Sequence, residues 1–313
     1  MTTPGMWFEP FGDLRPRTIA ACPGALAAEG TAGDADEIRV ARWDGSLTPS
    51  HRVPIPSPEQ PISSAWLSLD PTGAELSLAV ALGSEMGWDL GVTVFPSLDG
   101  APEPVGRHPE QEDFDFGAPL LLRGDELFLR GADMLYLARR GGGAWEIDPL
   151  TEEDDEFEVE EWGWSLSLSQ DRLRLAAPCC TLDDASAVAV FARDEVSDPF
   201  RLRASFEVPD DPVGMHLLPN GRILAAFFDG LRLYESDGDS WHETAAFTPP
   251  QGGAVQSMDA FGSRAVVAQL EQAWALDLAE GTWTKLAEGP RPNVAMMNTA
   301  AVVCLGAKFG VFE

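Results

Sequence analysis

The residues that could do chemistry in this chain are few and lie far apart in the sequence. It has four histidines and four cysteines among 313 residues. They are His51, His108, His216, His242, Cys22, Cys179, Cys180 and Cys304. No cysteines have the C-x-x-C spacing of a structural zinc site. The motifs of a serine nucleophile, a zinc protease and a phosphate-binding loop are also missing. We therefore predict no catalytic residue, no metal and no cofactor.

The cysteines and the N-terminal residues bear on location. We expect the cysteines to be reduced and mostly buried, as in a cytoplasmic protein, although the adjacent Cys179 and Cys180 could form a strained redox bridge. The N-terminal sequence MTTPGMWFEPFGDLRPR has no apolar stretch typical of a secretory signal. The chain has no run of about 18 apolar residues that could span a membrane. These features favour a cytoplasmic location.

Acidity is the main chemical feature of the chain. It has 51 Asp and Glu against 21 Lys and Arg, and a net charge of -30. This charge argues against nucleic acids and anionic membranes as partners, because both require clustered Lys and Arg. Two interpretations remain open. The acids provide solubility or adaptation to high salt, or they attract a basic protein or peptide.

The elements that must position these residues are hairpins. Residues 134–147, 233–244 and 274–286 each contain an alternating apolar run, a turn with glycine, and a tryptophan that begins a second run. A hairpin that recurs along a chain indicates a repeat fold. Short turns of the same kind, such as Arg123-Gly124-Asp125, separate other alternating runs. No segment shows a 3.6-residue apolar period, so the sequence predicts an all-β protein.

The repeat has a period of roughly 40 to 50 residues with four strands per unit, which is typical of a β-propeller blade. The predicted blades are 18–56, 62–108, 117–150, 163–208, 213–249, 254–290 and a last unit, 294–313. That unit has only three strands. We predict that residues 6–12 complete it, with Trp7 and Phe8 buried, because closure removes a free sheet edge. The prediction is a single domain over 1–313 with seven blades; six blades is the alternative.

The tryptophan hairpins resemble kelch repeats, in which a tyrosine strand precedes a tryptophan strand. The matching pairs are Tyr136 with Trp145, Tyr234 with Trp241, and Trp274 with Trp283. The fourth unit resembles an FG-GAP repeat over residues 165–178 and 187–193. Both resemblances imply a propeller, and neither implies a particular activity. The equivalent positions of Trp145, Trp241 and Trp283 favour packing between blades over ligand stacking.

The acids fall mainly on one predicted face. In a blade, the loop after the second strand and the link to the next blade share a face, and most acidic clusters lie in these segments. We call this the acidic rim and predict that it binds a partner, with nearby aromatic residues as apolar anchors. The predicted binding residues are Glu152, Glu153, Asp154, Asp155, Glu156, Phe157, Trp162, Trp88, Asp89, Glu112, Asp113, Asp183 and Asp184. The alternative is a set of solvated links.

These observations predict a non-catalytic protein-binding propeller. It would act as a scaffold, adaptor or neutralising partner that presents its acidic rim to a basic protein or peptide, and we expect a monomer. The alternative is an enzyme, such as a propeller lyase or hydrolase, with its site at the mouth of the central channel. His216 falls on a predicted innermost strand there, although a lone channel histidine is more often a hydrogen-bonded structural residue. A calcium-stabilised surface module is a third hypothesis.

Overall fold

The computed structural model describes residues 5–33, 35–55, 64–71, 75–84, 87–105, 117–131, 134–142, 144–150, 159–163, 165–238 and 240–313. Within these ranges the protein is all-β and contains no helix. Consequently, no helix among these residues is long and apolar enough to cross a membrane.

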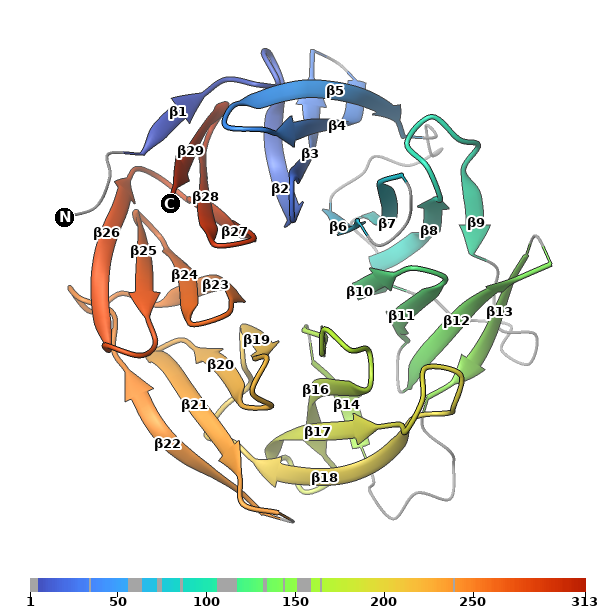
Figure 1. Cartoon of the computed structure of the whole chain (residues 1–313), viewed down its shortest axis with the longest axis vertical. Helices are drawn as coiled ribbons and strands as arrows, with labels where there is room; N and C mark the ends of the chain where they lie inside the picture. Colours follow the sequence, from blue (N-terminus) through green and yellow to red (C-terminus); the bar gives the residue numbers. More distant parts are fainter. Residues whose placement is uncertain are drawn as a thin grey trace.

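The strands form seven antiparallel sheets that surround a central channel (Figure 1). Blade 1 is β2 (Arg15–Cys22), β3 (Ala25–Ala32), β4 (Ala35–Trp43) and β5 (Leu47–Pro54). Blade 2 is β6 (Ser64–Asp70), β7 (Ser77–Ser84), β8 (Gly87–Phe95) and β9 (Glu103–Val105). Blade 3 is β10 (Gly117–Arg123), β11 (Glu126–Arg130), β12 (Leu135–Gly141) and β13 (Ala144–Pro149).

The remaining blades follow in chain order around the ring. Blade 4 is β14 (Val159–Trp162), β15 (Ser167–Leu168), β16 (Arg174–Thr181), β17 (Ser186–Ala192) and β18 (Arg201–Glu207). Blade 5 is β19 (Gly214–Leu217), β20 (Ile223–Phe227), β21 (Gly230–Ser236) and β22 (Trp241–Phe247). Blade 6 is β23 (Val255–Phe261), β24 (Arg264–Gln269), β25 (Gln272–Asp277) and β26 (Thr282–Glu288). Blade 7 is β27 (Asn293–Met297), β28 (Ala300–Leu305), β29 (Lys308–Phe312) and β1 (Met6–Phe8).

The seven-bladed prediction is confirmed, and the six-bladed alternative is wrong. Short turns build each blade because the sequence supplies residues suited to them. Gly262 lies between β23 and β24 with a φ of +63°, and Gly306 lies between β28 and β29 with a φ of +59°. Residues with side chains are strained in this left-handed region, whereas glycine is not.

The described residues form seven separate core clusters, one at each interface between neighbouring blades. The half-buried outer-strand tryptophans Trp145, Trp241 and Trp283 each pack against one of these clusters. Trp241 of blade 5 stacks on Phe206 of blade 4, with ring centroids 5.1 Å apart. The repeated tryptophan therefore packs between blades, as its position in the repeat predicts.

The N-terminal strand closes the ring. β1 pairs antiparallel with β29, so that Phe8 lies opposite Phe309, and Figure 1 shows the two strands side by side in blade 7. The expected burial of Trp7 is wrong, because its side chain is 44% exposed. β1 is the outer strand of its blade, so one of its two faces points to solvent. Phe11, just after β1, is buried instead and packs edge-on against Phe309, with centroids 5.1 Å apart.

Candidate functional site

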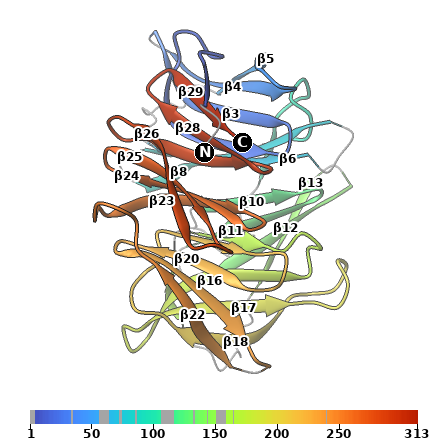
Figure 2. The same ribbon diagram turned by 60° about the vertical axis from the view of Figure 1, so that its left-hand side comes forward.

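Two regions of the ring could recognise a ligand. The first is the central channel, lined by the innermost strand of each blade. The second is the face on which the second-to-third-strand loops and the inter-blade links emerge, which we call the long-loop face. The opposite face carries the other turns and is called the short-turn face. Figure 2 shows the ring turned by 60° so that the strands are seen crossing between these faces.

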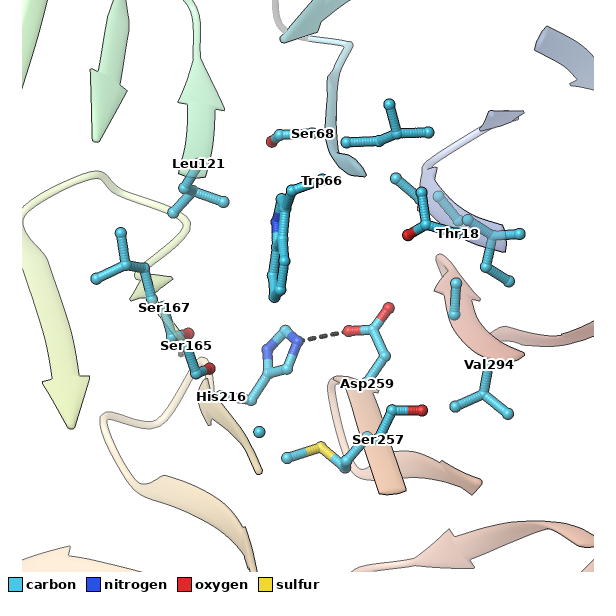
Figure 3. Close-up of a pocket in the computed structure, with 18 of the residues that line it drawn as sticks. Thr18, Trp66, Ser68, Leu121, Ser165, Ser167, His216, Ser257, Asp259 and Val294 are labelled. Carbon is cyan, nitrogen blue, oxygen red and sulfur yellow. Dashed lines mark hydrogen bonds and ion pairs between the residues drawn. The ribbon is translucent and has the colours of Figure 1, made fainter. Parts of the chain in front are cut away.

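The channel contains a cavity of about 350 Å³. All seven innermost strands contribute to its wall, including Thr18 from β2, Trp66 from β6, Arg123 from β10, His216 from β19 and Asp259 from β23. In Figure 3, the indole of Trp66 and the imidazole of His216 both project into the cavity. The cavity therefore combines aromatic, cationic, imidazole and carboxylate groups from four different blades.

Most hydroxyl groups of the channel wall hold neighbouring blades together. Ser68 Oγ accepts a hydrogen bond from the Leu122 amide at 3.0 Å, which joins blade 2 to blade 3. Ser165 Oγ accepts from the Met215 amide at 3.0 Å and Ser167 Oγ from the Leu217 amide at 2.7 Å, which join blade 4 to blade 5. These contacts satisfy backbone donors that would otherwise be unpaired in the wall. We conclude that these serines are structural.

His216 and Asp259 connect blades 5 and 6. His216 Nε2 lies 2.6 Å from Asp259 Oδ1, the contact drawn as a dashed line in Figure 3. Asp259 Oδ1 also accepts the Ala260 amide at 2.8 Å, and Oδ2 accepts the Met296 amide of blade 7 at 2.6 Å. The carboxylate thus links three blades. His216 is a hydrogen-bonded channel residue, and its Nδ1 has no hydrogen-bond partner among the described residues.

Arg123 lies at the end of β10, where the channel approaches the short-turn face. Its Nη1 donates to the carbonyl of Leu122 at 2.7 Å. No carboxylate of the described residues lies within ion-pair distance of its guanidinium. Burial lowers the pKa of Arg123, while Asp70, Cys22 and Asp259 act in the opposite direction at longer range. The cavity therefore has a cation at one end.

The cysteines offer no reactive thiol in the channel. None of the four forms a disulfide, and Cys22, Cys179 and Cys304 are buried. Burial raises the pKa of each of these three thiols to about 12, which keeps them protonated and unreactive at neutral pH. The adjacent Cys179 and Cys180 carry no disulfide. The parts of the chain that the structure describes contain no group of three or more His, Cys, Asp or Glu side chains arranged to hold a metal.

The structure describes only some of the predicted acidic-rim residues. Asp183 and Asp184 are exposed in the β16–β17 loop of the long-loop face. Trp88 and Asp89 are in strand β8, and their side chains lie outside the described residues. Six residues from Glu152 to Phe157, together with Glu112 and Asp113, lie outside the described residues as well.

Trp162 needs a correction. Its side chain is 1% exposed and packs in the cluster between blades 3 and 4, near Phe191 with centroids 6.0 Å apart. Strand β14 pairs with β16, and this pairing directs Trp162 toward the core even though Glu161 beside it is exposed. A partner cannot reach a side chain buried in this way, so Trp162 is not a surface anchor.

Sequence reasoning missed a set of exposed apolar residues on the long-loop face. Leu182, Phe228 and Leu270 are 58%, 54% and 59% exposed. They occupy the second-to-third-strand loops of blades 4, 5 and 6. We call these three residues the apolar loop tips. In each case the next residue is acidic, namely Asp183, Asp229 and Glu271. This repeated apolar–acidic pair is the signal in the sequence that could have revealed them.

No family model and no curated protein sequence matches the chain. Solved structures match along nearly its whole length. One is titled "YCF48 bound to D1 peptide", with 11% identity, a TM-score of 0.62, and coverage of 99% of this chain and 95% of that chain. Likeness at this identity shows the fold alone.

Two further matches are lyases. Virginiamycin B lyase from Staphylococcus aureus has 12% identity, a TM-score of 0.63, and coverage of 99% of this chain and 98% of the other. A streptogramin B lyase has 11% identity, a TM-score of 0.65, and coverage of 99% and 97%. The same architecture thus occurs in a peptide complex and in enzymes.

Proposed function

We propose that this protein is a non-catalytic binding propeller that takes a basic protein or peptide on the long-loop face of blades 4 to 6. The apolar loop tips Leu182, Phe228 and Leu270 carry this proposal. Large apolar side chains exposed on one face at equivalent positions of three adjacent blades are candidate anchors for an interaction surface. A scaffold, an adaptor and a neutralising partner would all use such a surface. A monomeric state and a cytoplasmic location are part of the proposal.

The backbones beneath the loop tips are anchored. The Phe228 carbonyl accepts the Val255 amide of blade 6 at 3.1 Å, and the Leu270 carbonyl accepts the Arg291 amide at 2.7 Å. The loop that carries Leu182 is closed by the Thr181 amide, which donates to the Ala185 carbonyl at 3.0 Å. Anchored loops lose little conformational entropy on binding, so their exposed side chains are suitable anchors for a partner.

The charges around the loop tips support a basic partner. Asp183, Asp184 and Glu271 are exposed, and their side chains form no ion pair within the described ranges. Asp229, in contrast, pairs with Arg232 at 3.1 Å. Unpaired surface carboxylates attract cations and speed association with a positively charged partner. Glu152, Glu153, Asp154, Asp155 and Glu156 would add to this attraction, and their contribution stays a prediction.

A paired capture experiment tests the proposal. Purified parent protein and a variant with Leu182→Ser, Phe228→Ser and Leu270→Ser are incubated with native lysate at low and high salt. Quantitative mass spectrometry identifies the captured proteins. We expect a basic protein that the parent binds at low salt, that high salt weakens, and that the triple variant loses. Val196→Ser is the matched control, because Val196 is 37% exposed in the β17–β18 loop on the opposite face. Equal capture by the parent and the triple variant would contradict the proposal.

The acidic rim has its own test once that partner is known. Replacing Glu152, Glu153, Asp154, Asp155 and Glu156 with Gln or Asn should slow association rather than speed dissociation, because surface charge acts mainly on the encounter rate. Added salt should reduce the difference between parent and variant, since charges are screened beyond about 8 Å at physiological ionic strength. Identical association rates and salt slopes would show that this segment is a solvated link.

An enzyme with its site in the channel is the second candidate. The contact between His216 and Asp259 in a cavity that Arg123 also lines favours it, because a histidine oriented by a carboxylate is a common general base. The two lyases of the same fold give a first substrate to try. If the candidate is right, the parent protein should consume virginiamycin B, as followed by mass spectrometry, and His216→Asn should not. An unchanged compound after prolonged incubation with the parent would remove this lyase activity from consideration.

A further inference from the structure

We propose that the channel cavity binds a small molecule with an aromatic or apolar body and a single oxyanion, a carboxylate or a phosphate, that pairs with Arg123. This site is separate from the proposed docking surface on the long-loop face and does not depend on it. It requires binding only, and no reaction. Three features support it: the guanidinium of Arg123 forms no ion pair with a described residue, the nearby carboxylates have other partners, and the groups that line the rest of the cavity suit a small ligand.

Arg123 differs from the arginines that are buried most deeply, all of which form ion pairs. Arg193 is fully buried and forms a bidentate pair with Glu126, at 2.6 and 2.7 Å. Arg39 is also buried and pairs with Glu37 and Asp13. Pairing is expected for a guanidinium that is removed from water, because arginine does not release its proton to escape the cost of burial. Arg123 is partly buried in the cavity wall, and within the described ranges its guanidinium has only the carbonyl of Leu122 as a hydrogen-bond partner.

The two carboxylates that attract Arg123 are already engaged. Asp70 is 1% exposed, and its Oδ2 accepts the amide of Gly124. Asp259 holds His216 and two backbone amides. Both carboxylates reduce the free-energy cost of burying the charged guanidinium of Arg123, but neither is close enough to form an ion pair with it. The remaining guanidinium donors therefore have no acceptor in the part of the chain that the structure describes, and their geometry suits the two oxygens of a carboxylate or a phosphate.

The rest of the cavity suits the body of such a ligand. Trp66 offers a flat apolar surface, and Leu121 and Met258 add apolar walls. His216 Nδ1 is available as a hydrogen-bonding group. The volume of about 350 Å³ is at the lower end for ligand pockets, which fits a small molecule. A net charge of -30 repels polyanions at long range, so a ligand with one oxyanion is favoured over a nucleotide chain or a polyphosphate.

The test uses three probes of similar shape: phenylacetate, phenyl phosphate and the uncharged phenylacetamide. Titration calorimetry and tryptophan fluorescence measure their binding to the full-length protein. We expect at least one anion to bind and the amide to bind at least tenfold more weakly. The stronger of the two anions identifies the oxyanion as a carboxylate or a phosphate. If neither anion binds the parent protein, the proposal is wrong.

Two substitutions and one control locate the binding. Arg123→Gln should weaken binding of the preferred anion at least tenfold. Arg123→Lys should retain part of the affinity because it keeps the positive charge. Arg140→Gln is the control, since Arg140 pairs with Glu103 on the outer part of blades 2 and 3 and is absent from the cavity wall. Unchanged affinity in Arg123→Gln would overturn the assignment.

Thermal melting gives a second readout. A ligand that binds the folded protein stabilises it, so the preferred anion should raise the melting temperature of the parent more than that of Arg123→Gln. An equal rise in both proteins would also overturn it.

Discussion

The channel wall and the apolar loop tips arise from the same repeated hairpins, and the ring uses them in opposite ways. In the wall, several polar side chains accept a backbone amide of the next blade, as Ser68, Ser167 and Asp259 do. At the loop tips, Leu182, Phe228 and Leu270 extend into solvent. Polar groups inside and apolar groups outside reverse the usual preference. The polar side chains of the wall therefore stabilise the ring by joining neighbouring blades. The contacts of the described residues show no such structural role for the loop tips.

Among the described residues, Arg123 and the Nδ1 atom of His216 are two groups of the wall that form no hydrogen bond to a neighbouring blade. Each is a polar group in the cavity that the neighbouring blade does not use. A feature of the ring that stability does not explain is a candidate for function, and this reasoning applies equally to the loop tips and to these two groups. Measurements of how much each region contributes to the free energy of unfolding would test this comparison.

Ring closure should give the largest effect. Deletion of residues 1–12 removes β1, its pairing with β29 and the buried side chain of Phe11. Loss of one buried aromatic residue alone costs about 3–5 kcal/mol, and the open edge of β29 adds to this cost. We expect a large fall in the melting temperature, followed by circular dichroism, and a tendency to aggregate. If the truncated protein has the same melting temperature as the parent, β1 contributes nothing to closure of the ring.

A pair of tryptophans separates the core from the surface. Trp162→Ala should lower the free energy of unfolding by about 3–5 kcal/mol, because the side chain is fully buried between blades 3 and 4. Trp7→Ala is the matched control, since Trp7 is largely exposed and should cost much less. Denaturant titration measures both values. Equal effects would mean that exposure does not distinguish the two positions.

The fold was predictable from the sequence because it depends on local patterns. Alternating runs, short turns and the recurring tryptophan specify hairpins, and their period specifies blades. The predicted units differ from the observed blades by only a few residues at their ends, and the closing strand was found in the right place. The surroundings of single side chains were less predictable. Trp162 follows a dense acidic run, which suggested a surface position, but its strand pairing turns it inward.

The channel contacts could not be predicted because they join distant parts of the chain. His216 and Asp259 are 43 residues apart and meet only when blades 5 and 6 are side by side. Arg123 was part of an Arg-Gly-Asp turn, and the local sequence predicts that turn without indicating that its guanidinium lies in a cavity. The apolar loop tips were visible as residues but not as a set, since their equivalence depends on the alignment of three blades.

The channel link at Asp259 should have an intermediate effect. Asp259→Ala leaves the amide of Met296 and the ring of His216 without their acceptor, and an unsatisfied buried donor costs about 1–3 kcal/mol. Ser257→Ala is the control from the same strand, because Ser257 lines the same cavity and its hydroxyl has no hydrogen bond to another described residue. We expect this control to change stability little. If both variants unfold at the same denaturant concentration as the parent, the wall does not hold the blades together.

The smallest effect should come from the apolar loop tips, and it decides whether the comparison is right. Exposed side chains away from special contacts change stability by less than about 0.5 kcal/mol when replaced. The triple variant Leu182→Ser, Phe228→Ser and Leu270→Ser should therefore unfold close to the parent in a denaturant titration. Phe227→Ser, next to Phe228 but buried in the interface between blades 4 and 5, should be strongly destabilised. If the triple variant loses several kcal/mol, the loop tips are part of the fold, and their exposure would no longer argue for a partner. If it keeps its stability and loses the captured protein, the apolar surface serves binding rather than the ring.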